Sequence, residues 1–255
     1  MQLRVLGCSG SISRGNHTTS LLVDDDVLID AGTGVGELTL DEMITIKHVF
    51  LTHSHLDHLA SLPFLVDVLF SRDTEPLRVY ASHDTIDAIQ RHIFNWEIWP
   101  DFAELPSKQA PVIKFFPMNN DSVLELDGRR FEMIPVNHVV PGVAYHVSNG
   151  SGGSFCFSGD TTSNDTLWEA LNGKPDLDLL VVEVGFPNEQ LELSRLAKHY
   201  CPQLLGEDLQ KLNHRPRIGI SHLKPGSEDR AFQECQESID GFELLRLRGG
   251  DTFTL

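Results

Sequence analysis

The strongest constraint in this sequence is a run of three histidines and an aspartate, His53, His55, Asp57 and His58, within six positions. The run follows the apolar residues 49–51 and precedes an amphipathic stretch, so it is predicted to lie on a loop between a strand and a helix. His53 and His55 are two positions apart, which places both side chains on one side of an extended chain, where they can reach one ion. Asp57 and His58 come where the chain turns into the helix, and they can face a second ion.

Imidazole and carboxylate without thiolate suit zinc, iron or manganese in a site that keeps a position for water. One histidine alone would be better explained as an ordinary half-buried side chain. Four such residues together favour a metal site.

Three further residues stand where a predicted strand gives way to a loop, namely His138, Asp160 and His222. Asp30 ends another buried strand and is predicted to accept a hydrogen bond from the outer N–H of a ligand histidine. The other histidines have no partner at ligand spacing, so His17, His48, His92, His146 and His214 are predicted not to bind metal, and His83 is predicted to begin a helix.

The strand and helix signals predict one α/β domain over residues 1–255. The predicted strands are 3–6, 20–23 and 27–30 as an antiparallel start, then 47–52 and 79–81, then a second, antiparallel set at 112–116, 123–126, 131–136, 143–147 and 154–157, and finally 179–184 and 217–220. The predicted helices are 59–70, 83–94, 165–171 and 202–212. Residues 95–111 contain Trp96, Trp99 and Phe102, and we expect an irregular connection or lid whose aromatic side chains pack on the core.

The pattern H-x-H-x-D-H after a strand resembles the signature of the metallo-β-lactamase superfamily. The resemblance implies a four-layer αββα sandwich with metal ions at one edge. It assigns His53, His55 and His138 to one divalent ion and Asp57, His58 and His222 to a second, with Asp160 bridging the two. Zinc is the expected metal, with manganese and iron as alternatives.

Within the superfamily, three segments resemble the class II cyclic-nucleotide phosphodiesterases. Residues 183–188 resemble their E-x-S-F-P-N block, with Gly185 in place of the usual serine. Residues 198–202 resemble their G-H-L-T-P block, in which His199 and Pro202 are kept, and residues 222–225 match H-x-K-P. The resemblance implies hydrolysis of a 3′,5′-cyclic nucleotide, cAMP or cGMP, to the 5′-nucleotide. His199 would act on the scissile phosphate, and Asp57 would be a ligand, alone or while also orienting the nucleophile.

The second hypothesis is an RNase Z-like tRNA 3′-processing endonuclease, and a third is hydrolysis of another small phosphodiester. RNase Z grips tRNA with a long basic arm, whereas residues 138–160 contain only a short Gly-Ser turn. The formal charge of −17 also repels the phosphate backbone of a long nucleic acid. A non-catalytic metal-binding interaction protein is the alternative from another class, and it leaves the complete, open ligand set unexplained.

The remaining features bear on location. Cys8, Cys156, Cys201 and Cys235 are widely spaced, which indicates neither a disulfide framework nor a thiolate metal site. We expect a cytoplasmic protein without a membrane segment, since neither a leader nor a long apolar run is found. The resemblance also suggests a homodimer.

Overall fold

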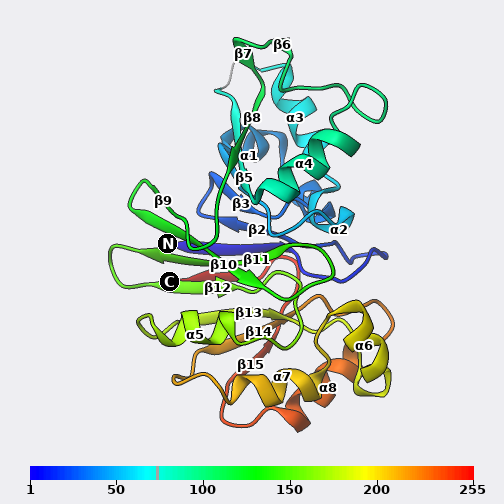
Figure 1. Ribbon diagram of the computed structural model, residues 1–255, viewed down its shortest axis with the longest axis vertical. Coiled ribbons are helices and arrows are strands. Elements are labelled where there is room, and N and C mark those ends of the chain that lie inside the picture. The colour runs from blue at the N-terminus through cyan, green and yellow to red at the C-terminus, as the bar shows by residue number, and fades with distance from the viewer. Residues whose placement is uncertain (73–74) are drawn as a thin grey trace.

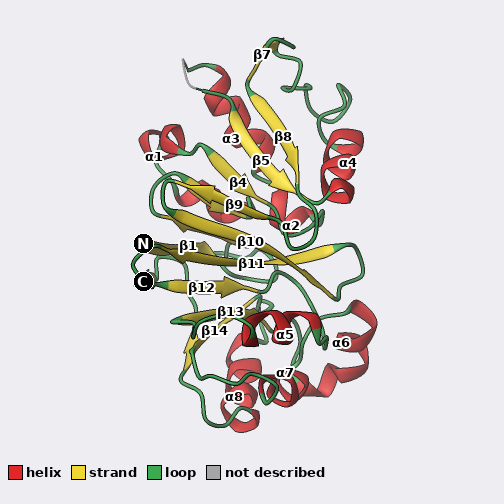
Figure 2. Cartoon of the chain, turned by 60° about the vertical axis from the view of Figure 1, so that its left-hand side comes forward, coloured by secondary structure: helices red, strands yellow, loops and turns green. Residues whose placement is uncertain are grey.

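The structure is a computed structural model that describes residues 1–72 and 75–255. Two seven-stranded sheets in the described residues face each other, and helices cover the outer side of each sheet. Figures 1 and 2 show these four layers, with the sheets in the middle and helices at the two ends of the long axis. This is the αββα sandwich expected from the sequence.

The first sheet has the strand order β16-β1-β2-β3-β4-β5-β8. Its first strands are antiparallel, as predicted, whereas β3, β4, β5 and β8 run parallel. The bounds are β1 (Gln2–Gly7), β2 (Ser20–Val23), β3 (Val27–Ile29), β4 (His48–Phe50), β5 (Leu77–Ala81), β8 (Ile113–Pro117) and β16 (Thr252–Thr254). The assignment of residues 112–116 to the second, antiparallel set was wrong, because β8 pairs in parallel with β5 after the crossover through α4 (His83–His92).

The second sheet has the order β15-β14-β13-β12-β11-β10-β9. Strands β9 to β12 form the antiparallel run predicted from their short turns, and β12 to β15 are parallel. The bounds are β9 (Val123–Leu126), β10 (Arg129–Val136), β11 (Gly142–Asn149), β12 (Ser154–Phe157), β13 (Leu179–Glu183), β14 (Arg217–Ser221) and β15 (Leu244–Arg246).

Helices pack on the outer faces through apolar stripes. On the first sheet these are α1 (Leu40–Thr45), α3 (Leu62–Phe70) and α4, while α5 (Thr166–Asn172), α7 (Pro202–Leu209) and α8 (Glu228–Ser238) cover the second sheet. The short helices η1 (Thr33–Glu37), α2 (Leu56–Leu59), η2 (Asn188–Gln190) and α6 (Leu191–Ala197) lie in connections. In the described chain, no helix combines the length and apolar character needed to cross a membrane.

The two sheets meet through a shared apolar core. Phe50 of β4 stacks on Phe131 of β10 with ring centroids 4.5 Å apart, and both rings are fully buried. Burial of large aromatic side chains from both sheets is a major source of stability, since each removes a large apolar area from water. The contact also fixes the two sheets relative to each other, and with them the strand ends that carry the site.

Two local predictions need correction or qualification. The single helix predicted for residues 59–70 is two helices, α2 and α3, because the chain turns at Ala60 and Ser61. Residues 95–111 are largely irregular, with only the two-residue strands β6 (Pro106–Ser107) and β7 (Ala110–Pro111). Phe102 is buried and Trp99 packs against the core, as expected, but the Trp96 side chain is exposed.

Candidate metal centre

The predicted site residues come from strand ends that meet at one edge of the sandwich. His53 follows β4, His138 follows β10, Asp160 follows β12 and His222 follows β14. Strands β12 and β14 run in the same direction as β13, and β10 runs in that direction too because two antiparallel pairings separate it from β12. Their carboxyl ends therefore share one edge, where chemistry-bearing loops commonly lie.

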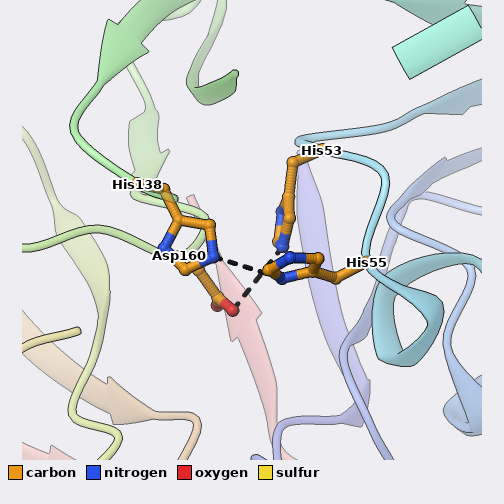
Figure 3. Close-up of side chains that lie close together, drawn as sticks. All are labelled: His53, His55, His138 and Asp160. Carbon is orange, nitrogen blue, oxygen red and sulfur yellow. Dashed lines mark hydrogen bonds and ion pairs between the residues drawn. The ribbon is translucent and has the colours of Figure 1, made fainter. Parts of the chain in front are cut away.

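Four side chains form the first cluster: His53, His55, His138 and Asp160. Nε2 of His138 lies 3.2 Å from Nδ1 of His55, and Nε2 of His53 lies 3.6 Å from Oδ2 of Asp160. Figure 3 shows these side chains pointing toward one another, with His53 and His55 on one loop and His138 and Asp160 on two others. Three imidazoles and one carboxylate at this spacing form a donor set typical of zinc.

The second cluster contains Asp57, His58, His222 and, again, Asp160. Oδ1 of Asp160 lies 3.3 Å from Nε2 of His58 and 3.3 Å from Nδ1 of His222, and Oδ2 of Asp57 lies 3.7 Å from Nε2 of His58. Asp160 thus turns Oδ2 toward the first cluster and Oδ1 toward the second. This arrangement matches the bridging position that the resemblance implies for Asp160.

The unpaired nitrogens show that the residues fit a bound cation. Nε2 of His53, Nε2 of His58 and Nδ1 of His222 are buried and have no hydrogen-bond partner among the residues described. Buried polar atoms rarely stay unpaired without a ligand or a functional reason. Burial also lowers the pKa of His53 well below its usual range, that of His138 to about 4 and that of His222 to about 3. Neutral imidazole offers the lone pair that a metal needs.

Neighbouring residues hold the opposite ring nitrogens of two cluster histidines, His58 and His138. Nδ1 of His58 donates to Oδ2 of Asp30 at 2.6 Å, which confirms the hydrogen bond predicted for Asp30. Asp30 is fully buried and also accepts the backbone N–H and the hydroxyl of Thr52. Nδ1 of His138 donates to the carbonyl of Lys198 at 3.0 Å. Such contacts fix the tautomer, so that the other nitrogen faces the cluster.

His58 differs electrostatically from His53, His138 and His222, the other buried histidines of the two clusters. Burial lowers its pKa, but the carboxylates of Asp160 and Asp30 outweigh burial and raise the pKa well above its ordinary value. His58 therefore lies between two carboxylates that both favour its protonated form.

His199 lies beside the clusters and is held by Glu183. Nδ1 of His199 donates to Oε1 of Glu183 at 2.8 Å and lies 4.0 Å from Oδ2 of Asp160. Burial lowers the pKa of His199, but the Glu183 carboxylate outweighs burial and raises it to about 8. This shift favours the protonated imidazole, which can donate a proton.

Glu183 is the residue that the sequence analysis did not assign. It is fully buried and also accepts the backbone N–H of Thr161 at 3.0 Å. Its only signal in the sequence was its place in the E-x-S-F-P-N-like block. A Cβ at Gly185 would lie 3.0 Å from the Cβ of His199, so glycine there lets the His199 ring approach closely.

The structure brings all eight predicted site residues together. These residues differ in side-chain exposure: Asp57 is 32% exposed, whereas Asp160 and His222 are nearly inaccessible. Within the part of the chain that the structure describes, none of the histidines predicted not to bind metal joins either cluster, and His83 begins α4 as expected. These outlying histidines are His17, His48, His92, His146 and His214.

Comparison with known proteins identifies the class to which this fold and site belong. Residues 26–239 match the family model of the beta-lactamase superfamily domain. The chain belongs to the metallo-β-lactamase superfamily, whose fold implies binding of divalent metal.

The chain is also similar to individual proteins with named activities. The chain is 28% identical to a probable 3′,5′-cyclic-nucleotide phosphodiesterase from Yersinia pestis, over 97% of this chain and 87% of the relative. It is 26% identical to a ribonuclease Z from Methanococcus maripaludis, over 57% of this chain and 48% of the relative. The crystal structure of unliganded yeast PDE1 superposes on this chain with a TM-score of 0.82. The two sequences are 17% identical, and the superposition covers 100% of this chain and 99% of that chain.

Proposed function

We propose that the chain is a binuclear metal-dependent phosphodiesterase that hydrolyses 3′,5′-cyclic nucleotides to 5′-nucleotides. The observation that carries the proposal is the placement of His199, held by buried Glu183, next to two clusters that share Asp160. The relative from Yersinia pestis, named for the same reaction, and the block at residues 183–188 support the choice of substrate.

Two divalent ions, one in each cluster, are part of this proposal. His53, His55, His138 and Asp160 would hold the first, and Asp57, His58, His222 and Asp160 the second. Bound ions of this kind would polarise the phosphoryl oxygens and make water a competent nucleophile at neutral pH. Zinc suits the donor atoms best, with manganese and iron as alternatives.

The protein's own groups then have separate roles. His199 donates a proton or hydrogen bond to the ribose 3′ oxygen as the P–O bond breaks, and Glu183 keeps its ring in place and its charge positive. Asp57, whose carboxylate is partly exposed, would bind metal and would also orient the attacking water. Proton transfer of the kind assigned to His199 is worth about 10²–10⁴-fold in rate.

A tRNA-processing role has less support in this chain. The relative named ribonuclease Z aligns with only 57% of it. Strands β11 and β12 are joined by the short turn of residues 150–153, which is too short to contain a basic arm. The charge of −17 also opposes binding of a long phosphate backbone.

The first experiment compares substrates with the metal-loaded protein. We expect turnover of 3′,5′-cAMP or 3′,5′-cGMP and none of precursor tRNA, with 2′,3′-cyclic nucleotides as the comparison for another small phosphodiester. Turnover of precursor tRNA alone would replace the proposal with the ribonuclease Z hypothesis. Bound metal without turnover of any substrate would favour the interaction protein.

The second experiment tests His199 through the leaving group. His199→Ala is expected to slow hydrolysis of the cyclic nucleotide by about 10²–10⁴-fold and to slow bis(p-nitrophenyl) phosphate far less, because nitrophenolate leaves without a proton. Metal content should stay unchanged. His92→Ala, which changes an exposed histidine of α4, is the matched control. Equal losses on both substrates would assign His199 to phosphate binding.

A cytoplasmic location and a homodimer stay predictions of the sequence. Sedimentation at several protein concentrations tests the homodimer, and a monomer at all of them would contradict it.

A further inference from the structure

A polar cavity with a volume of about 370 Å³ opens on the outer face of the second sheet, beside the end of α5. Alternation along the strands places the side chains of Arg130, Glu132, His146 and Ser148 on this face, which also bears the apolar residues packed under α5. Arg130 is eight residues before His138, or roughly 25 Å along the strand direction. The cavity is therefore separate from the metal centre.

His146 is the feature that points to a ligand. It is only 5% exposed, lines the cavity, and neither of its ring nitrogens has a hydrogen-bond partner within residues 1–72 and 75–255. Burial lowers its pKa to about 4, with Lys174 contributing in the same direction, so the ring is neutral and offers one N–H donor and one acceptor. A buried ring with two unpaired nitrogens is costly unless something binds it.

The charges around His146 indicate the sign of that ligand. Lys174 donates to Oε1 of Glu132, which shows that an oxyanion is accommodated at this ammonium. Arg130 lies 3.8 Å from the other carboxylate oxygen of Glu132, and its side chain is 53% exposed, so its guanidinium is not held in a close pair. Among the residues that line the cavity, the cations Arg130 and Lys174 outnumber the one carboxylate, Glu132. Two further carboxylates lie beside the lining, because Glu125 stands opposite Arg130 on β9 and Asp178 accepts the N–H of Ser154.

A metal ion is the less suitable ligand here. Arg130 and Lys174 would repel it, and burial raises the pKa of the neighbouring Cys156 thiol beyond the range in which it would ionise. Guanidinium and ammonium donors are instead the groups that bind phosphate.

We propose that this cavity binds the phosphate group of a small anion. Arg130 and Lys174 share its charge, the His146 N–H donates to one of its oxygens, and the hydroxyl groups of Ser148 and Ser154 line the remaining wall. Glu132 competes with the anion for the two cations. The inference does not depend on the reaction proposed for the metal centre.

The test is titration of the metal-loaded protein with inorganic phosphate at constant ionic strength, read from the NMR signals of the His146 ring. A saturable shift is expected, and His146→Gln assigns the signal. This reporter is insensitive to phosphate bound at the metal centre, because the two sites lie at opposite ends of the strands. A shift that sodium chloride reproduces at the same ionic strength would overturn the proposal.

Two substitutions should change the Kd for phosphate in opposite directions, and a third serves as the control. Arg130→Gln is expected to raise the Kd for phosphate about tenfold, the usual scale for one charge-assisted contact, and Glu132→Gln to lower it by a similar factor. Arg91→Gln, which removes the same charge from an exposed position of α4, is the matched control and should leave the Kd unchanged. If Arg130→Gln and Glu132→Gln both leave it unchanged, the proposal is wrong.

Glycerol 3-phosphate in place of inorganic phosphate distinguishes the two sources of the phosphate group. Tighter binding of glycerol 3-phosphate supports a phosphomonoester as the ligand, since the cavity is larger than one phosphate ion. Equal Kd values support free phosphate.

Discussion

The hydrogen bond between Asp30 and His58 offers the sharpest test of the metal centre. Asp30 accepts from Nδ1 of His58 and from Thr52, and all three residues are buried. Asp30→Asn keeps the shape of the side chain but can place an NH₂ group opposite Nδ1 of His58. The favoured tautomer of neutral His58 then carries its proton on Nε2, the nitrogen that faces the second cluster. We predict that the substitution weakens metal binding in that cluster.

The magnitude follows from the contacts that change. Loss of the outer partner of a metal-binding histidine costs about 10–100-fold in metal affinity, equal to about 1.4–2.7 kcal/mol. The metal-free protein loses a hydrogen bond to a charged group, worth about 1.5–3 kcal/mol. The first cluster contains neither Asp30 nor His58, so its affinity should change far less.

The assay is competition for zinc with a chelator of known affinity, together with urea unfolding of the metal-free protein. His48→Gln is the control, because His48 is also a buried residue, lies on β4 with Nδ1 3.3 Å from the hydroxyl of Tyr80, and belongs to neither cluster. If Asp30→Asn binds two zinc ions with affinities within twofold of those of the unmodified protein, the argument about the tautomer is wrong.

Two further predictions concern the carboxylate that both clusters share and an ion pair outside the metal centre. Asp160→Ala should abolish stable binding of both ions, because one carboxylate serves both clusters, and metal analysis that still finds two ions per chain would contradict the bridging assignment. Arg129→Met should lower the free energy of unfolding by about 3 kcal/mol at pH 7, since the buried guanidinium binds both oxygens of Asp26 at 2.6 and 2.9 Å. Burial raises the pKa of Asp26, but the Arg129 contacts outweigh it and lower the pKa, so the contribution is complete above pH ~4 and should fade as pH falls through the lowered pKa. Urea unfolding at several pH values measures the difference, and a difference that does not vary with pH would refute this account.

The site was largely predictable because its signals are local. The spacing of His53, His55, Asp57 and His58 is explained by one strand end and one turn. His138, Asp160 and His222 each stand at a strand end, but only the resemblance joined them to the first four. Glu183 could not be recognised as a partner of His199, because 16 residues separate them and only folding brings them within 2.8 Å.

The fold was predictable to the extent that strands and helices have apolar periodicity. The assignment of β8 was wrong because a strand pattern identifies a strand but not the neighbour with which it pairs. Strands β15 and β16 were not predicted, since each has three residues that are partly or largely exposed. Helix α8 was also not predicted, because only Ala231 and Cys235 of its residues are buried in a mainly polar segment.

The pairing of β1 with β16 has a consequence for synthesis on the ribosome. Gln2 lies opposite Thr254, and the amino group of Met1 donates to the carbonyl of Leu255 at 3.0 Å, so the two termini lie side by side (Figure 1). Strand β1 is therefore made long before its partner β16. Until β16 has been made and has paired, the free edge of β1 presents unpaired backbone groups of the kind that recruit strands from other chains. We therefore expect the first sheet to be completed slowly and nascent chains of this protein to need chaperones. Both effects should be stronger than in a protein whose corresponding strand pairs on both edges early.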